Sequence, residues 1–190
     1  IYAITGLLLV PEYGVTTDEP LQRDHGLVTM DYIEGKLGLL DEKRMPEHEL
    51  VTYRHRYYGM WFQLISVFGE EQLGLETFHE QHLLRHYLLF AITAFCSIFF
   101  FLLLKKAFRH QGWALVGWLM LVLSPRIFAH SFYNTKDLVM LDMAILAIYT
   151  LWQFLERPNW RTALWHGLIC GLATDTRIVG IIFPGLTVGW

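Results

Sequence analysis

The sequence predicts an all-α polytopic membrane protein with five to six transmembrane helices and amphipathic helices beside the membrane in a large first outer loop. Hydrophobic residues make up 54% and aromatic residues 15% of the 190 residues, which is more than in a typical soluble domain. The longest apolar runs follow residue 86 and reach the length of membrane helices. Charged residues gather between residues 11 and 85, where 14 are acidic and 7 are basic.

The charge distribution excludes a nucleic-acid-binding protein, because no basic patch is present that could follow a phosphate backbone. Cys96 and Cys170 lie in apolar runs, which is typical of buried or lipid-facing thiols. The chain begins and ends inside apolar sequence. We therefore expect a single N-terminal part of a longer transmembrane domain, with residues 11–85 as the first extracytoplasmic loop and residues 86–190 as transmembrane helices.

The first outer loop is expected to contain short helices. Residues 1–10 are apolar but too short to cross a bilayer, so we expect them to end a span. A helix is predicted over residues 17–39, because Thr17 or Asp18 can cap its start and Pro20 suits its first turn. Residues 57–68 are apolar and aromatic, and their length favours a helix at the interface or a re-entrant piece.

The clearest predicted span covers residues 87–104, which are 18 uncharged residues followed by Lys105 and Lys106. Basic residues mark the cytoplasmic end of a span, so the first loop is expected on the opposite face. Residues 112–123 are predicted to return, and residues 126–137 to form a polar outer loop. Residues 138–155 are then predicted to cross back, with Asp142 in an interhelical hydrogen bond.

The last segments are predicted to turn on the cytoplasmic side at residues 156–161 and to go out again over residues 162–174. Asp175 and Arg177 then interrupt the apolar sequence. Because charges are costly inside a membrane, we expect these two residues to pair with each other or with neighbouring helices. Residues 178–190 are expected to return, to lie along the interface, or to continue the preceding segment as one bent helix.

Three polar clusters fall on the outer face in this topology: the adjacent pair Asp18 and Glu19, residues 126–137, and residues 175–177. A carboxylate can take a proton from an attacking hydroxyl or amine. Arginine, lysine and histidine can hold a phosphate as it leaves. Sugar transfer from a lipid-linked phosphosugar requires both functions, a base for the acceptor and cations for the leaving phosphate. The structural alternative is that the acidic pair only stabilises a helix N-terminus, by about 0.3–1 kcal/mol.

The chain resembles the membrane glycosyltransferases of the GT-C type, in particular the phospholipid-carrier-dependent group with the protein O-mannosyltransferases and the aminoarabinose transferase of lipid A. The stretches that match are TTDEPLQRDHG, LRHYL, LSPRIFAHSFYNTKDL and GLATDTRIVG. The resemblance covers most of the chain but only the N-terminal part of such an enzyme. Many relatives have a His-Pro-Pro-Leu-like segment before the second span, where this chain has YYGM at residues 57–60.

The resemblance implies a catalytic role for the first-loop acidic pair. Asp18 would be the general base or orient the acceptor, and Glu19 would support it. Asp137 would contact the acceptor or a metal, and transfer would invert the sugar carbon. Arg85 and His86 either reach lipid headgroups at the start of a span or bind a lipid phosphate. The expected contacts to the carrier phosphate are Arg85, His86, Arg126, His130, Lys136 and Arg177.

The implied partners are a polyprenyl- or dolichyl-phosphate sugar donor, an acceptor that is a protein, lipid or glycan, and membrane lipids. The implied location is the bacterial inner membrane or the endoplasmic reticulum membrane, with several spans. Some members of the group use a divalent metal and others do not, and no metal position follows here. Two alternatives remain: a transporter or channel that depends on Asp142, Asp175 and Arg177, and a non-catalytic subunit of a membrane assembly.

Overall fold

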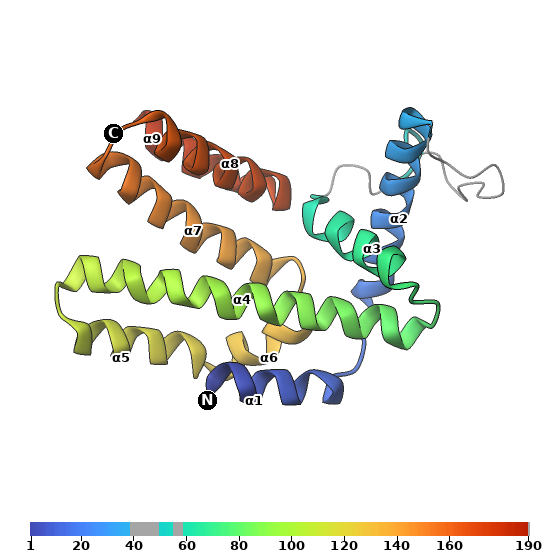
Figure 1. The fold of residues 1–190 in the computed structure, drawn as a ribbon, viewed down its shortest axis with the longest axis horizontal. Helices are drawn as coiled ribbons and strands as arrows, with labels where there is room; N and C mark the ends of the chain where they lie inside the picture. The colour runs from blue at the N-terminus through green and yellow to red at the C-terminus, as the bar shows by residue number, and fades with distance from the viewer. Residues whose placement is uncertain (39–49, 55–58, 190) are drawn as a thin grey trace.

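The computed structural model describes residues 1–38, 50–54 and 59–189, and all regular structure among them is helical (Figure 1). The predicted all-α class is therefore confirmed. In chain order the elements are α1 (Tyr2–Leu9), η1 (Val10–Glu12), α2 (Asp18–Leu37), α3 (Trp61–Leu73), α4 (Phe78–Phe108), α5 (Gln111–Val122), α6 (Pro125–Tyr133), α7 (Asp137–Glu156), α8 (Trp160–Thr176), η2 (Ile178–Ile181) and α9 (Ile182–Val188).

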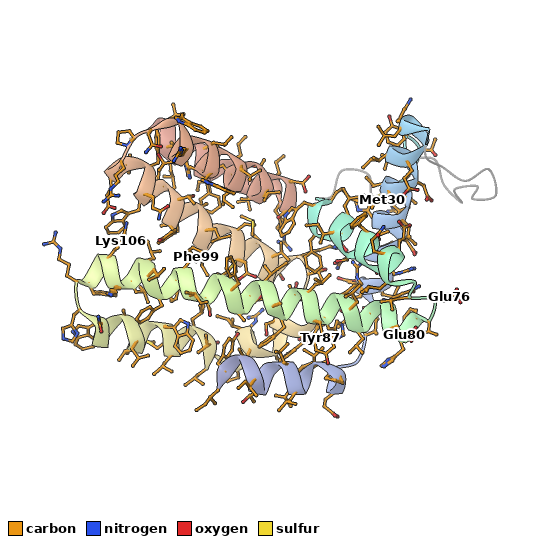
Figure 2. All side chains as sticks on the ribbon, in the orientation of Figure 1. Met30, Glu76, Glu80, Tyr87, Phe99 and Lys106 are labelled. Carbon is orange, nitrogen blue, oxygen red and sulfur yellow. The ribbon has the colours of Figure 1, made fainter. Side chains whose placement is uncertain are left out.

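Helix α4 is the central element, with α1, α5 and α6 on one side and α7 on the other (Figure 1). Its 31 residues span about 46 Å at 1.5 Å per residue, which exceeds the hydrocarbon core of a membrane. It begins inside the predicted first loop, because Thr77 and Glu80 form a capping box there. Figure 2 shows Glu76 and Glu80 at one end of α4 and Lys106 at the other.

Helices α4 and α7 are long and apolar enough to cross a membrane by length and composition. Helices α5 and α6 together would be a third span, bent by 58° between them. The predicted count of five to six spans is not confirmed by the described residues. Large apolar side chains on α5 and α8, such as Trp113, Met120 and Leu164, point outward, as expected for helices in contact with lipid.

Helices α4 and α7 run in the same direction and meet at two polar contacts. Thr93 donates a hydrogen bond of 2.8 Å to the buried Asp142, so the predicted interhelical hydrogen bond of Asp142 is confirmed. Lys106 and Glu156 form an ion pair of 2.7 Å between the C-terminal ends of the two helices. The N-terminal end of α7 therefore lies toward the N-terminal end of α4.

The polar loop predicted over residues 126–137 is instead mostly helix α6. Pro125 occupies the first turn, where proline favours a helix. Phe132 is buried against Val10 and Phe90 in a small core, and this burial outweighs the polar character of the surrounding residues. Only residues 134–136 separate α6 from α7.

The chain reverses after α8, so α9 packs back along α8 instead of continuing it. His166 in α8 hydrogen-bonds to Thr187 in α9 at 2.7 Å and to Thr150 in α7 at 2.9 Å. Gly180 lies in the reversal, where an added Cβ would stand 2.3 Å from the backbone of Ala173. The described residues 178–189 thus do not continue α8 as one bent helix; that they cross the membrane again or lie along its interface stays a prediction.

Helices α2 and α3 lie together at the N-terminal end of α4 (Figure 1). Helix α2 ends at Leu37 and is followed by Gly38, whose φ of +69° suits glycine. Helix α3 covers most of the apolar stretch predicted over residues 57–68. Residue 39, the last residue of the predicted helix, and the tyrosines at 57 and 58 lie outside the described residues.

The close packing at the chain reversal predicts opposite effects for two glycines near and in α8. Gly180→Ala should destabilise the fold by about 1–3 kcal/mol, because the new methyl group meets backbone atoms. Gly171→Ala is the matched control, since nothing lies within 4 Å of its added Cβ, and it should be neutral or stabilising by up to about 1 kcal/mol. Thermal unfolding in detergent micelles measures both, and equal melting temperatures would contradict the packing described.

Candidate active site

A polar pocket of about 250 Å³ lies where the start of α2, the α6–α7 junction and the end of α8 meet. It brings together side chains from the three polar clusters expected on one face. Its charged members are two carboxylates and two cations, so their formal charges balance. The lining residues are Thr16, Thr17, Asp18, Gln22, Tyr133, Asn134, Lys136, Asp137 and Arg177.

The two adjacent carboxylates of the first loop differ completely in environment. Asp18 is exposed and lines the pocket, and its side chain has no hydrogen-bond partner among the described residues. Glu19 is only 1% exposed and accepts a hydrogen bond of 2.7 Å from His86 Nε2 in α4. Asp18 is therefore available to a bound molecule, whereas Glu19 is engaged within the protein.

The start of α2 is held by Glu19. Thr17 occupies the N-cap position, but its side chain makes no capping hydrogen bond. The backbone N–H of Thr16 instead donates to Glu19 Oε2 at 2.7 Å. Both carboxylates still lie in the first turn, where negative charge favours the helix dipole. The sequence predicted that Thr17 or Asp18 would cap the start of this helix, and neither side chain makes that hydrogen bond.

The turn between α6 and α7 is organised by Asn134. Its side-chain oxygen accepts a hydrogen bond of 2.9 Å from the backbone N–H of Asp137, and its Nδ2 donates to Asp137 Oδ2 at 3.0 Å. His130 lies 2.8 Å from the same Nδ2, through its Nδ1. These contacts fix the carboxylate of Asp137 at the pocket edge.

Arg177 reaches the pocket from the end of α8. Its Nη2 lies 2.5 Å from Asp137 Oδ1, and the two side chains are 46% and 56% exposed. The predicted partner Asp175 is elsewhere: its Oδ2 accepts hydrogen bonds from the backbone N–H groups of Met60 and Trp61, at 2.8 and 2.9 Å. Asp175 and Arg177 were expected to pair with each other or with neighbouring helices, and the second arrangement is the one observed.

A buried layer of amides lies behind the pocket. Gln22, which lines the pocket, accepts hydrogen bonds from Thr135 and from Gln63 of α3. Gln63 in turn accepts from Arg85 of α4. Glu70 of α3 completes the layer through an ion pair of 3.3 Å with Arg85. The layer joins α2, α3 and α4 with the turn between α6 and α7, so the pocket wall is held by hydrogen bonds between buried polar groups.

The structure places the predicted phosphate contacts in different surroundings. Lys136 and Arg177 line the pocket. Arg85 is buried in contact with Glu70, and His86 is buried in contact with Glu19. Neither side chain is exposed to reach lipid headgroups, which was one of the two interpretations of this pair.

Arg126 and His130 both lie on α6 but outside the pocket lining. Arg126 is exposed in the first turn, whereas His130 contacts Asn134. Their contacts to a phosphate stay predictions.

Several lining residues were given no functional role from the sequence, although Thr16, Thr17, Gln22, Tyr133 and Asn134 lie in the matching stretches TTDEPLQRDHG and LSPRIFAHSFYNTKDL. Gln63, the partner of Gln22, lies outside those stretches and carries no such signal, because an isolated glutamine is an ordinary helix residue. The described residues contain no group of three or more His, Cys, Asp or Glu side chains that could hold a metal ion.

The contrast within the acidic pair predicts unequal effects on stability. Glu19→Ala leaves His86 buried without its partner and should lower the free energy of unfolding by about 3 kcal/mol. Asp18→Ala removes an exposed side chain that has no hydrogen bond among the described residues and interacts only with the helix dipole, so it should lower the free energy of unfolding by less than about 1 kcal/mol. Denaturant unfolding in micelles compares the two, and a larger loss for Asp18→Ala would refute the assignment.

The comparisons with known proteins assign the family. No curated protein and no solved structure matches the chain significantly. The family model described as dolichyl-phosphate-mannose-protein mannosyltransferase matches residues 72–187. The match includes the pocket residues of the α6–α7 junction and Arg177, while Asp18 and Glu19 precede it. Since the match covers more than half of the sequence, the chain belongs to the dolichyl-phosphate-mannose-protein mannosyltransferase family.

Proposed function

We propose that this protein is a glycosyltransferase that moves a sugar from a polyprenyl- or dolichyl-phosphate donor to an acceptor on the extracytoplasmic or lumenal side of a membrane. The observation that carries the proposal is the convergence of Asp18, Asp137 and Arg177 on one pocket, in a chain of this family. The chain is then part of the catalytic transmembrane domain, and the acceptor is a protein, lipid or glycan.

Asp18 is the general base in this proposal. Its carboxylate faces the pocket, and no described donor occupies its oxygens. It takes the proton from the acceptor hydroxyl as the acceptor oxygen attacks the anomeric carbon. The bond between that carbon and the phosphate oxygen breaks, and its electron pair leaves with the carrier phosphate. A single displacement of this kind inverts the configuration of the sugar carbon.

Lys136 and Arg177 hold the carrier phosphate. Both line the same pocket as Asp18, and cationic side chains neutralise the charge that develops on a leaving phosphate. Arginine offers five N–H donors in a planar fork, so Arg177 can contact a phosphate while one nitrogen stays on Asp137. Asp137 orients Arg177 and contacts the acceptor.

The buried residues Glu19, Arg85 and His86 support the site from behind. Glu19 and His86 fix the first turn of α2, from which Asp18 extends. Arg85 holds Gln63, which contacts the pocket residue Gln22. Glu19, Arg85 and His86 therefore hold the pocket residues in place and do not contact the substrates themselves. The exposed and half-buried residues of the pocket make the substrate contacts.

The distribution of basic residues supports the extracytoplasmic or lumenal face for the pocket. Lys105, Lys106 and Arg109 follow the apolar part of α4, Arg157 lies between α7 and α8, and Arg161 lies in the first turn of α8. Basic residues favour the cytoplasmic side, and all five lie at the ends of α4 and α7 that are distant from the pocket. A multi-pass arrangement in the bacterial inner membrane or the endoplasmic reticulum membrane fits this orientation.

A transporter or channel is less well supported by the charges on which it would depend. Asp142 accepts from Thr93 within the α4–α7 contact. Asp175 accepts from the backbone at the start of α3. Both carboxylates are thus engaged in contacts between helices, whereas Asp18 faces an open polar pocket.

Replacing the general base should abolish turnover without loss of fold. In membranes supplied with labelled polyprenyl-phosphate and dolichyl-phosphate sugars, Asp18→Asn should lower donor consumption by at least about 100-fold. The matched control is Glu12→Gln, an exposed carboxylate of η1 outside the pocket, which should keep wild-type activity. Full activity of Asp18→Asn would refute the role of Asp18, and no consumption of any donor by the wild type would refute the transferase proposal.

Single cysteines should report the orientation of the pocket. The native Cys96 and Cys170 are buried, so they give little background with a membrane-impermeant thiol reagent. Thr17→Cys and Asp137→Cys should be labelled from the extracytoplasmic or lumenal side, and Arg109→Cys and Arg157→Cys only after the membrane is permeabilised. All four positions are exposed. Labelling of Thr17→Cys and Asp137→Cys from opposite sides would contradict the mechanism.

A further inference from the structure

Residues 175–177 at the end of α8 attach in succession to two other parts of the structure, the start of α3 and the start of α7. Asp175 contacts the start of α3, Thr176 contacts Trp61, and Arg177 contacts Asp137. We propose that Asp175 is a positioning residue for the transfer reaction, which fixes the end of α8 on α3 and thereby places Arg177 in the pocket. This inference rests on the proposed function, in which Arg177 binds the carrier phosphate.

The contact of Asp175 with α3 satisfies backbone groups that the helix itself leaves unpaired. The first N–H groups of a helix have no partner within it, and the N-cap residue Met60 provides no side-chain hydrogen bond. Asp175 Oδ2 accepts from the N–H groups of both Met60 and Trp61. A carboxylate at this end also interacts favourably with the helix dipole. Asp175 is therefore the cap of α3, supplied from a residue more than 100 positions later in the chain.

Two neighbouring contacts show that the junction between α3 and α8 is closely fitted. Thr176 Oγ1 accepts a hydrogen bond of 2.7 Å from Trp61 Nε1 and donates one of 2.8 Å to the carbonyl of Leu172. At Gly59 an added Cβ would stand 1.7 Å from the carbonyl oxygen of Asp175. The two backbones can approach this closely only because residue 59 has no side chain.

The position of Arg177 depends on where α8 ends. Arg177 leaves the helix in an extended conformation, with φ −151° and ψ 142°, and its carbonyl accepts from Gly180 N–H in the chain reversal. Its side chain has one ion pair, with Asp137, and both partners are about half exposed. Exposed ion pairs hold side chains weakly. The anchoring of the preceding residues on α3 therefore acts together with Asp137 to direct Arg177 toward the pocket.

Helix α3 is a suitable anchor because it also contacts the opposite wall of the pocket. Gln63, one turn after the capped end, donates to Gln22 of α2 and to Thr135 of the α6–α7 turn. The helix that Asp175 caps thus touches both of the other segments that form the pocket. Asp175 thereby sets the position of the phosphate-binding Arg177 relative to the base Asp18.

A double-mutant cycle on donor KM tests this role, because a residue that acts through Arg177 has no further effect once Arg177 is removed. In the membrane-embedded protein with a labelled polyprenyl-phosphate sugar, Arg177→Gln should raise donor KM by roughly tenfold and Asp175→Ala by roughly fivefold. The double variant should match Arg177→Gln alone. Asp175→Asn keeps an acceptor oxygen for the α3 backbone, so it should raise donor KM less than Asp175→Ala does. This increase should also be absent when Asp175→Asn is combined with Arg177→Gln.

The matched control is Asn159→Ala, which removes a two-bond cap at the other end of α8, where Asn159 accepts from Arg161 and Thr162. It should lower stability but leave donor KM unchanged. If Asp175→Ala or Asp175→Asn raises KM equally with and without Arg177, or if Asn159→Ala raises it as much, Asp175 has only a structural role. If Arg177→Gln leaves KM unchanged, the phosphate-binding role of Arg177 fails. An effect of Arg177→Gln with none from either Asp175 variant overturns only the positioning role.

Discussion

The hydrogen bond between Glu19 and His86 is the contact on which the arrangement of the site depends. It joins the first turn of α2 to the central helix α4, and both side chains are almost fully buried. A buried carboxylate is stable only when donors replace the water it has lost, and here His86 and the backbone N–H of Thr16 do so. Because successive residues of a helix point in different directions, burial of Glu19 turns Asp18 outward, into the pocket.

The remaining architecture divides into an apolar part and a polar part that meet at the pocket. Helices α4 and α7 pack through apolar side chains and one internal hydrogen bond between Thr93 and Asp142. Outside the predicted membrane region, α2 and α3 are joined to α4 by the buried amides and ion pairs around Gln63 and Arg85. A site between these parts can take a phosphate and an acceptor from water while the lipid tail of a carrier stays beside the apolar helices.

The sequence predicted the helical class, the interhelical bond of Asp142 and the convergence of the polar clusters, because hydrophobic runs and charge placement are local signals. It did not predict α6, where burial of Phe132 outweighed polar neighbours. Nor did it show that Glu19 would be buried and Asp18 exposed, or that Asp175 would cap α3. These contacts join residues far apart in the chain, and a single sequence contains no information about such pairings beyond residue type.

The measurement that tests the central claim most directly is an experimental structure of the membrane-embedded protein with a bound polyprenyl-phosphate sugar. The carrier phosphate should lie within hydrogen-bonding distance of Arg177 and Lys136, with the sugar carbon facing Asp18 and the lipid tail leaving along the apolar helices. A phosphate bound elsewhere, with the pocket between α2, α7 and α8 empty, would show that these three segments do not form the site of transfer.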